Sequence, residues 1–379
     1  MKILFINHSA AKTGAPIVLL HFLKWLKQNK DLSFDVLSLQ NGSLLEAFSE
    51  VSEKHYYKLK KDFVLNKIDR YIKSKQKGSV KGRLLYPQNA LKSIAKNNYD
   101  LIYANSIISI PAAHFIKKNS GTKAKLLVHI HELNLTINQY CSELNAYEPS
   151  IDFTIAVSNK VKQNLITNWG FNDNKIKIVY AHSKVDDLNK KVDKQFIVGG
   201  SGVVGWRKGP DFFVLVAQYV FNKFPDLPIK FQWVGKISKL NQFIYNQDIE
   251  RLGLRDKLKF VGAKDNPHDY FSNFDIFLMT SKEDPFPLVC VEVGMMGKPI
   301  ICFKDATGTQ EVLMPVENAV IPYLDIAKMS EMVVQYFNDK DLRHNDGMKI
   351  KQIFLEFTPE KQGAKLYKII KGLIDAPFN

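Results

Sequence analysis

Residues 276–303 read IFLMTSKEDPFPLVCVEVGMMGKPIICF, two short apolar runs on either side of a polar loop and a helical segment. The first run, Ile276–Met279, has the length of a buried strand, and a loop rich in proline and acidic residues follows it. A helix begins near Leu288, and Gly297-Lys298-Pro299 leads into the second run. Strand, helix and strand in this order predict one βαβ unit of a parallel sheet.

The same alternation runs through both halves of the chain. Predicted strands lie at 3–6, 34–39, 101–104, 126–130 and 153–157, then at 196–199, 229–234, 258–261, 276–279, 299–303 and 319–321. Helical patterns of about ten or more residues separate several of them, at 17–26, 211–224 and 326–337. The fold class is therefore α/β, with two Rossmann-like, doubly wound domains.

The length also favours two domains, because a single core stops growing near roughly 250–300 residues and this chain has 379. The run 184–194 is rich in lysine and aspartate and has few large apolar residues, as expected of a connector. We therefore predict an N-terminal domain over 1–185 and a C-terminal domain over 186–358.

Composition narrows the class of protein and its partners. A hydrophobic content of 45% with 24% charged residues excludes a disordered chain. Lysine and arginine total 53 against 38 acidic residues, so the net charge of +15 points to phosphate-rich partners. The three cysteines, Cys141, Cys290 and Cys302, lack metal-ligand spacing and are predicted to be free core thiols in a reducing compartment. The sequence has no apolar run long enough for a signal peptide or a membrane span, so we expect a cytoplasmic protein whose membrane contacts are peripheral.

Much of the excess charge lies in residues 54–83, which contain eleven lysines and arginines and only two acidic residues, Asp62 and Asp69. Aromatic residues are interleaved with these cations. A basic amphipathic segment of this kind fits docking on an anionic membrane surface. A solvated helical insertion without a partner is the open alternative. Nucleic acid is not expected as a partner, because no recognition motif accompanies the segment.

Three further features have the composition of a phosphate-ligand site. Asp284 and Glu292, with seven residues between them, flank the start of the predicted helix near Leu288. Ligands of doubly wound sheets bind outside the carboxyl ends of the strands, where a helix N-terminus offers N–H groups to phosphate. The glycine-rich turn 200–209 contains Lys208, and glycines let the backbone approach phosphate closely. In the first half, a small-residue loop follows the first strand and His131 ends another.

These motifs resemble the retaining GT-B glycosyltransferases known as glycosyl transferases group 1, or family four. The matches are the E-x7-E spacing, the Lys208-Gly209 turn, the Gly14-Ala15 loop and His131. The resemblance covers nearly the whole chain except 54–83. It implies the GT-B fold, two Rossmann-like domains facing a central cleft, with a final helix at about 359–379 that joins the N-terminal domain.

The resemblance also implies roles for particular residues. The catalytic group would be His131 near the reacting carbon and one of Glu283 and Asp284 on the hydroxyls of the donor sugar. Glu292 would hold the ribose. The rest of the donor-binding set is Gly14, Ala15, Gly205, Arg207, Lys208, Phe286, Pro287, Leu288 and Val289. Two positions depart from the family pattern: Asp284 stands where glutamate is usual, and Gly202 stands where a second basic residue is usual, so Arg207 either substitutes for it or points to solvent.

The implied reaction is retaining transfer of a sugar from a nucleotide-sugar donor to a glycan or lipid-linked acceptor, in bacterial cell-surface polysaccharide synthesis. The leaving diphosphate would accept the proton of the acceptor, so the protein mainly positions groups and stabilises charge. No cofactor is implied, and no metal, because the chain has no Asp-x-Asp motif. A GT-B nucleotide-sugar epimerase and a non-catalytic subunit of a glycan assembly complex remain alternatives.

Overall fold

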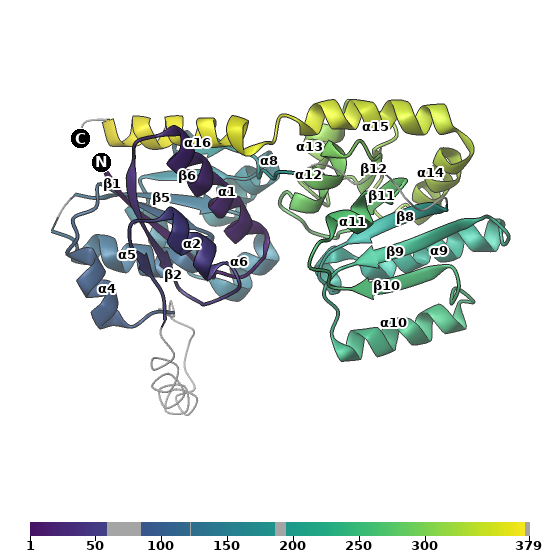
Figure 1. Ribbon diagram of the computed structural model, residues 1–379, viewed down its shortest axis with the longest axis horizontal. Helices are drawn as coiled ribbons and strands as arrows, with labels where there is room; N and C mark the ends of the chain where they lie inside the picture. Colours follow the sequence, from purple (N-terminus) through teal and green to yellow (C-terminus); the bar gives the residue numbers. More distant parts are fainter. Residues whose placement is uncertain (59–84, 122, 186–194, 376–379) are drawn as a thin grey trace. The chain divides into compact units, whose positions relative to one another are not determined.

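The computed structural model describes residues 1–58, 85–121, 123–185 and 195–375. In these ranges the chain forms two compact units, each built around its own sheet (Figure 1). Unit 1 contains Met1–Tyr180 and Pro359–Asn379, and unit 2 contains Ala181–Thr358. The division thus falls five residues before the predicted boundary at 185/186. Most of the basic segment 54–83 and of the connector 184–194 lies outside the described residues.

Unit 1 has a seven-stranded sheet in the order β3-β2-β1-β4-β5-β6-β7, and all its neighbouring strands are parallel. The strands are β1 Lys2–Asn7, β2 Ser33–Ser38, β3 His55–Tyr56, β4 Leu101–Asn105, β5 Lys125–Ile130, β6 Phe153–Ala156 and β7 Ile176–Ile178. The chain starts at β1, builds outward to β3 and then returns to β4 on the other side. The carboxyl ends of β1 and β4 therefore diverge into loops that leave room for a ligand.

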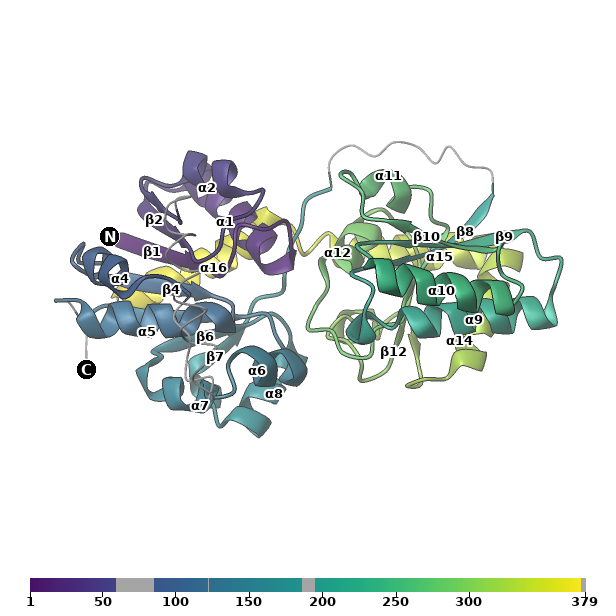
Figure 2. The ribbon, with the colours of Figure 1, turned by 90° about the horizontal axis from the view of Figure 1, so that it is seen from below.

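The helices of unit 1 cover both faces of this sheet (Figure 1). They are α1 Gly14–Asn29, α2 Leu45–Val51, α4 Gln88–Ala95, α5 Ile110–Asn119, α6 Asn134–Tyr140, α7 Leu144–Tyr147, α8 Asn159–Trp169 and α16 Pro359–Asp375. Helix α16 runs beside α1 in both views (Figures 1 and 2), although more than 300 residues separate them in sequence. The approach is close at Gly363, where a Cβ would lie 3.0 Å from Cδ2 of Trp25.

Unit 2 has a six-stranded parallel sheet in the order β10-β9-β8-β11-β12-β13. Its strands are β8 Phe196–Ser201, β9 Ile229–Val234, β10 Leu258–Gly262, β11 Ile276–Met279, β12 Ile300–Phe303 and β13 Val320–Ile321. Its helices are α9 Pro210–Lys223, α10 Lys239–Arg251, α11 His268–Phe271, α12 Leu288–Met295, α13 Gln310–Leu313, α14 Ile326–Asn338 and α15 Lys340–Phe354. The order of strands reverses between β8 and β11, which is the ligand-binding position of such sheets.

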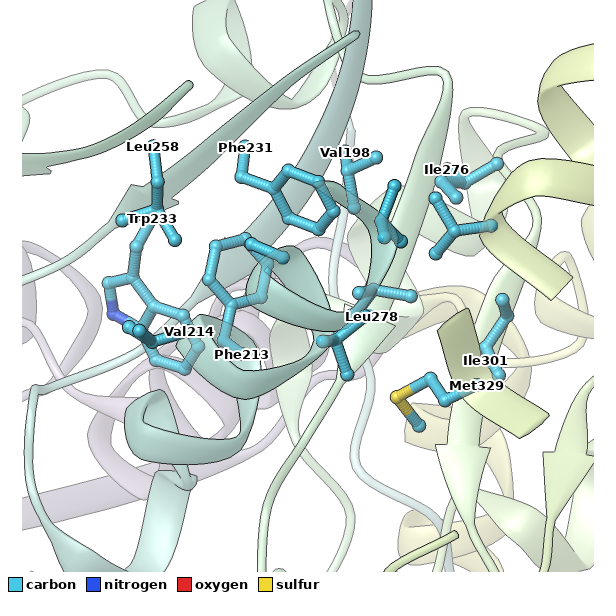
Figure 3. Packing of buried hydrophobic residues seen from close by; sticks show 14 of the residues in the cluster. Val198, Phe213, Val214, Phe231, Trp233, Leu258, Ile276, Leu278, Ile301 and Met329 are labelled. Carbon is cyan, nitrogen blue, oxygen red and sulfur yellow. The ribbon is translucent and has the colours of Figure 1, made fainter. Parts of the chain in front are cut away.

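Aromatic packing closes the core of unit 2 (Figure 3). Phe213 of α9 makes edge-to-face contacts with Phe231 and Trp233 of β9, at centroid distances of 5.5 and 5.3 Å. Gly200 of β8 is necessary here, because a Cβ at this position would lie 2.6 Å from Cε3 of Trp233. The glycines at the end of β8 therefore serve core packing as well as any contact with a ligand.

The predicted α/β class is confirmed, since both sheets are parallel and doubly wound. The elements that the sequence patterns did not predict include β3, β7, α10 and α15, and also the helices α2, α4, α5, α6, α7, α8, α11 and α13. The two strands have only two and three residues, too few for a periodic signal, and α15 is largely polar with a glycine at its centre. The cysteines at 141, 290 and 302 are buried free thiols, as predicted. Among the described residues, no helix is both long and apolar enough to cross a bilayer.

Candidate active site

The carboxyl ends of three neighbouring strands in unit 1 carry a polar network. His131 directly follows β5, and its Nε2 lies 2.9 Å from Oδ1 of Asn105, the last residue of β4. An amide oxygen only accepts hydrogen bonds, so Nε2 of His131 donates. The Asn105 amide nitrogen in turn donates to the Ala15 carbonyl oxygen at 3.0 Å and to Oδ1 of Asn7 at 3.2 Å. One amide therefore links His131 to the Gly14-Ala15 start of α1, which brings three predicted site residues together.

The imidazole of His131 also packs against a second histidine ring. Its ring lies 4.1 Å, centroid to centroid, from the ring of His129, which points to the same side of β5. Nδ1 of His129 is 2.6 Å from the Tyr103 hydroxyl. Burial raises the pKa of Tyr103 well above its usual value, so this hydroxyl stays protonated at neutral pH. Tyr103 is therefore uncharged, and its hydrogen bond with His129 holds the His129 ring in place beside the ring of His131.

Glu132 shapes the backbone at the same strand ends. Its carboxylate accepts hydrogen bonds from the Ser106 hydroxyl at 2.6 Å, from the N–H of Ile107 at 3.3 Å and from the N–H of His131 at 2.9 Å. Ser106 has a φ of +83°, a conformation that residues other than glycine seldom adopt. Glu132 therefore stabilises a strained turn after β4. Sequence reasoning did not assign Asn105 or Glu132 to the site, although both stand at strand ends beside the reversal of strand order.

A second histidine, His8, follows β1 in the same region. Burial lowers the pKa of His8 from 6.5 to about 4, which a hydrogen bond with the Asn105 backbone partly opposes. Its Nδ1 is buried without a hydrogen-bond partner in the described part of the chain. His8 is therefore neutral at physiological pH.

In unit 2, Lys208 and Asp284 form an ion pair at the reversal of strand order. Lys208 ends the 3-10 turn Trp206–Lys208 after β8, and Asp284 lies in the loop after β11. The ammonium nitrogen is 2.7 Å from Oδ2 of Asp284, and the two side chains are 17% and 4% exposed. Ser281 Oγ lies 3.5 Å from the same carboxylate oxygen. The structure thus brings together two residues that the sequence predicted for the donor site, and of the adjacent acids Glu283 and Asp284 it is Asp284 that contacts the lysine.

The two loops that carry this pair are joined along their backbones. The N–H groups of Lys282 and Glu283 donate to the carbonyl oxygen of Arg207 at 2.9 and 3.4 Å. Gly209 has a φ of +63°, and a Cβ there would lie 2.0 Å from the Thr280 carbonyl oxygen. Only glycine therefore permits the turn after β8 to pass so close to the end of β11.

Gly202, where a second cation was expected, lies against the stem of Lys208. A Cβ at Gly202 would be 2.9 Å from Cδ and Cε of Lys208, and its φ is +142°. Any larger residue there would have to displace Lys208. Arg207 is partly exposed and immediately precedes Lys208 in the sequence.

Glu292 is positioned from two other segments of unit 2. The Ser183 hydroxyl donates to Oε1 of Glu292 at 2.9 Å, and Nε2 of His268 lies 3.6 Å from Oε2. The carboxylate extends from the second turn of α12 and is 15% exposed. Its position is therefore fixed before any ligand binds.

The remaining predicted residues divide into buried and open positions. Phe286 and Pro287 are buried, and the Phe286 ring packs edge-to-face on Phe357 at 5.4 Å. Leu288 and Val289 are partly exposed at the start of α12, which has neither a side-chain cap nor an acidic residue in its first turn. A Cβ at Gly14 or at Gly205 would meet nothing within 4 Å, so packing in either unit does not require these two glycines.

A hollow of about 640 Å³ lies in another part of unit 2, between α10 and β10. It is lined by Gln242, Asn246, Ile249, Glu250, Arg255, Leu258, Lys259 and Phe260. None of the predicted site residues lines it. The polar networks described above therefore lie at the strand ends of the two units and not at this hollow.

Comparison with known proteins gives two family matches and several relatives. The model of glycosyl transferases group 1 matches residues 182–353, and that of Glycosyltransferase Family 4 matches residues 50–181. The chain is 21% identical to N-acetyl-alpha-D-glucosaminyl L-malate synthase of Bacillus anthracis over 70% of its length and 73% of the relative. It is 32% identical to the lipopolysaccharide core biosynthesis glycosyltransferase LpsD of Rhizobium meliloti, over 30% of the chain and 31% of the relative. The chain spans less than half the length of several other curated relatives, down to 31%.

The fold also matches solved structures over almost the full length. The crystal structure of Anabaena Alr3699/HepE in complex with UDP and glucose superposes with a TM-score of 0.75 and 18% identity. The match covers 98% of this chain and 100% of that one. At this identity the likeness establishes a shared architecture of two Rossmann-like domains.

Proposed function

Because the chain belongs to the glycosyl transferases group 1, a family of retaining GT-B enzymes that use nucleotide-sugar donors, we propose that it transfers a sugar to a glycan or lipid-linked acceptor. The product belongs to bacterial cell-surface polysaccharide synthesis. One observation carries the proposal: the Lys208–Asp284 pair lies between the loops after β8 and β11, where the strand order of the second sheet reverses. A cation and a carboxylate at that position suit a diphosphate and a sugar.

Unit 2 is proposed to hold the nucleotide-sugar. Lys208 supplies a positive charge to the diphosphate, and the N–H groups at the start of α12 near Leu288 supply further donors. Asp284 accepts hydrogen bonds from hydroxyls of the sugar. Glu292, held by Ser183 and His268, accepts hydrogen bonds from the ribose hydroxyls. Apart from the N–H groups of α12, each role uses a side chain that already has a partner in the fold.

Unit 1 is proposed to serve the reacting carbon and the acceptor. His131 donates a hydrogen bond from Nε2 to Asn105, which also donates to the Ala15 carbonyl oxygen. The same asparagine therefore holds the His131 ring and the backbone near Gly14 and Ala15 in a fixed arrangement. Because Nε2 carries the proton of a neutral His131, Nδ1 would accept one hydrogen bond from a sugar hydroxyl near the anomeric carbon. Small residues at 14 and 15 let the backbone approach a ligand closely.

The proposed reaction breaks the bond between the anomeric carbon and the diphosphate and forms a bond from the acceptor oxygen on the same face. The acceptor proton passes to an oxygen of the leaving diphosphate, so no protein base is required. Negative charge grows on the diphosphate in the transition state. Lys208 and the start of α12 stabilise that charge, which is the main catalytic contribution of the protein.

The first experiment uses the purified full chain with a panel of UDP, GDP and ADP sugars. The solved HepE structures contain UDP and UDP-glucose, so uridine nucleotides come first. We expect calorimetric binding of one nucleotide, and at least tenfold slower donor turnover in Lys208→Ala and in Glu292→Ala. Lys340→Ala, an exposed lysine at the start of α15, is the control. Near-normal turnover in both site variants would overturn the assignment.

The same experiment separates the alternative functions. Donor turnover that leaves the nucleotide-sugar changed only at one carbon, without any acceptor, would indicate an epimerase. Binding without turnover over a panel of acceptors would indicate a non-catalytic subunit. The spacing of Asp284 and Glu292 and the turn at Lys208 favour transfer.

We further propose that the protein works in the cytoplasm, at the inner face of the membrane, with residues 54–83 contacting anionic lipid. The Rhizobium meliloti relative is named for lipopolysaccharide core synthesis, which makes a lipid-linked acceptor reasonable here. The test is flotation with phosphatidylglycerol vesicles of a variant carrying Lys58→Glu, Lys60→Glu and Lys61→Glu. Unchanged binding of this variant would reject the segment as a docking site.

A further inference from the structure

Helix α10 of unit 2 has an apolar stripe on its solvent side. Leu240, Phe243 and Ile244 are 67%, 65% and 44% exposed, and their spacing of three and four residues places them on one helix face. Figures 1 and 2 show α10 on the outside of unit 2, along β10. Within this helix Ile249 is buried and Tyr245 packs against the core, so the core side of α10 is separate from Leu240, Phe243 and Ile244.

The stripe continues onto the loop that follows β8. Val203 and Trp206 in that loop are each 59% exposed. The loop is tied to the start of α10, because Asn241 Nδ2 donates to the Val204 carbonyl oxygen at 3.2 Å. The N–H of Val204 donates to the carbonyl oxygen of Lys236 at 2.8 Å, two residues before the helix cap. We call Val203, Trp206, Leu240, Phe243 and Ile244, with Lys236 and Lys239, the α10 patch.

The charges around the α10 patch are mainly positive. Segments 201–210 and 236–251 contain five cations, of which Lys208 is paired with Asp284, and two acids, of which Glu250 is paired with Arg255. The other acid, Asp248, is exposed four residues after Ile244 on the same helix face. Lys236 and Lys239 are exposed. The nearest acid on one side, Asp211, is 2.5 Å from the ammonium nitrogen of Lys282 and is thereby neutralised. The patch is therefore apolar at its centre and mainly cationic at its margin.

Other exposed apolar side chains of the protein have acidic neighbours. Met314 is 63% exposed and stands three residues from both Glu311 and Glu317. Leu355 is followed at once by Glu356. The α10 patch differs in degree, because lysines and arginines outnumber acidic residues around it.

We propose that the α10 patch docks unit 2 on an anionic lipid surface. Trp206, Phe243 and Leu240 would enter the interface between headgroups and acyl chains, where aromatic rings are favoured, and Lys236 and Lys239 would face lipid phosphates. A second copy of the chain is a poorer occupant, because facing patches would bring lysines of like charge together. The inference goes beyond the proposed function, since sugar transfer does not require unit 2 to touch a membrane, and the α10 patch is separate from segment 54–83.

The protein contains its own reporter for this contact. Of its four tryptophans, Trp206 is 59% exposed, while Trp25, Trp169 and Trp233 are 9%, 6% and 1% exposed. Vesicles of brominated phosphatidylglycerol should therefore quench Trp206 emission and shift it to the blue. Vesicles of brominated phosphatidylcholine should quench it far less, because the lysines lose their partners.

The decisive variant is Phe243→Glu with Ile244→Glu in the full chain. It places two acids in the α10 patch, so we expect about tenfold weaker binding to phosphatidylglycerol vesicles and loss of Trp206 quenching. Met314→Glu, an exposed apolar residue elsewhere in unit 2, is the matched control and should bind as the unchanged protein does. An unchanged circular dichroism spectrum and urea midpoint would show that the double variant still folds.

Three results would overturn the proposal. The first is full Trp206 quenching in the Phe243→Glu, Ile244→Glu variant. The second is binding that the changes at Lys58, Lys60 and Lys61 abolish while the α10 variant leaves it intact, which would assign docking to segment 54–83 alone. The third is a dimer in light scattering that the α10 variant dissociates, which would make the α10 patch a protein interface. Because none of these readouts uses a nucleotide or a sugar, failure here leaves the proposed sugar transfer untouched.

Discussion

The Lys208–Asp284 contact gives a single lysine two tasks. Asp284 is almost completely buried, and its charge is balanced by the ammonium group 2.7 Å away. A bound diphosphate would share that ammonium group with Asp284. Removing Lys208 therefore takes away a phosphate contact and also leaves a buried carboxylate without its cation, which is the more costly change for the fold.

The two effects separate in a double variant. We expect Lys208→Ala to lower the free energy of unfolding of unit 2 by about 3 kcal/mol. Adding Asp284→Asn should recover most of that loss, because no charge then remains buried, but nucleotide binding should stay weak. Urea unfolding and calorimetry measure the two quantities. If the double variant recovers nucleotide binding as well, Lys208 acts only through Asp284.

Gly209 is a second position where one residue fixes the site. Gly209→Ala should cost more than 2 kcal/mol of stability, because it combines a positive φ with a Cβ 2.0 Å from the Thr280 carbonyl oxygen. Gly253→Ala is the matched control, since Gly253 has a φ of +66° but open space around its Cβ. It should cost only the conformational strain of about 1–2 kcal/mol. Equal losses in denaturant unfolding would show that the contact with Thr280 relaxes freely.

His8 makes the stability of unit 1 depend on pH. Burial lowers its pKa in the folded state from 6.5 to about 4, so below pH 6.5 the unfolded chain binds a proton that the folded chain does not. The stabilising contribution is complete above about pH 6.5 and is lost as the pH falls toward 4. By pH 5 the loss is about 2 kcal/mol. His8→Gln should flatten the slope of unfolding free energy against pH between 7 and 5, and an unchanged slope would exclude His8 as its source.

For single residues, the sequence predicted which side chains belong to the candidate site but not which of them contact one another. The Lys208 turn and the acidic pair were predicted from residue types and spacing, but 76 positions separate Lys208 from Asp284, and only the sheet order brings them together. Phe286 packs on Phe357, which lies in a segment for which the sequence predicted no role. The burial of Phe286 was therefore not predicted. Asn105 was missed because a strand-end asparagine has the same sequence signal whether it binds a ligand or positions a histidine.

Among the elements, those with strong apolar runs were predicted closely. The strands 229–234 and 276–279 coincide with β9 and β11. Residues 276–279 are a continuous apolar run, typical of a buried parallel strand, and residues 229–232 alternate apolar and polar side chains, which is also a strand pattern. Helix α15 was missed because its one buried face is short and interrupted by Gly347. Helix α10 was missed because its apolar residues face solvent and not the core.

Helices α12 and α15 approach each other through small residues. A Cβ at Gly294 of α12 would lie 2.2 Å from Cδ2 of Phe354, and one at Gly347 of α15 would lie 2.3 Å from the Gly297 carbonyl oxygen. Since α12 carries Glu292, the position of the proposed ribose contact depends on this packing. Helix α15, which carries none of the predicted site residues, thus helps to hold Glu292 in position.

This support is testable by filling the contact. Gly347→Ala should raise the helix propensity of α15 yet destabilise unit 2 by about 1–3 kcal/mol, because its Cβ overlaps backbone that cannot move aside. Nucleotide affinity should fall with it, through the displaced α12. Gly372→Ala on α16, where a Cβ meets nothing within 4 Å, should instead stabilise slightly. Thermal unfolding of both variants checks the opposite signs.

For the whole molecule, the chain passes from unit 1 to unit 2 and returns. The resemblance to GT-B enzymes implied that a final helix joins the N-terminal domain, and α16 does pack on α1, with Leu366 and Ile370 in the core of unit 1. No local pattern in 359–375 distinguishes this from packing on unit 2. The two-domain division was accessible from length and the charged run 184–194, whereas the discontinuity was not.

Removing the α16 contact should affect one unit only. Leu366 is 1% exposed, so Leu366→Ala should cost about 2–5 kcal/mol through the cavity left against α1. Hydrogen exchange should accelerate in β1 and β4 of unit 1 and stay unchanged in β8 and β11 of unit 2. Lys365→Ala, on the exposed side of the same helix, is the control. Equal acceleration in both sheets would mean that the units unfold together.

The return of α16 also sets an order of events during biosynthesis. A ribosome completes residue 180 and must then translate the whole of unit 2 before α16 emerges, which takes about 10 to 35 s at elongation rates of about 5 to 20 residues per second. During that interval the nascent first unit lacks its last helix, and the surface of α1 around Trp25 has no cover. Unit 2 is continuous and can fold as soon as it leaves the exit tunnel. The unit made first is thus the last to be finished, and chaperones that recognise apolar surface have their longest opportunity at α1.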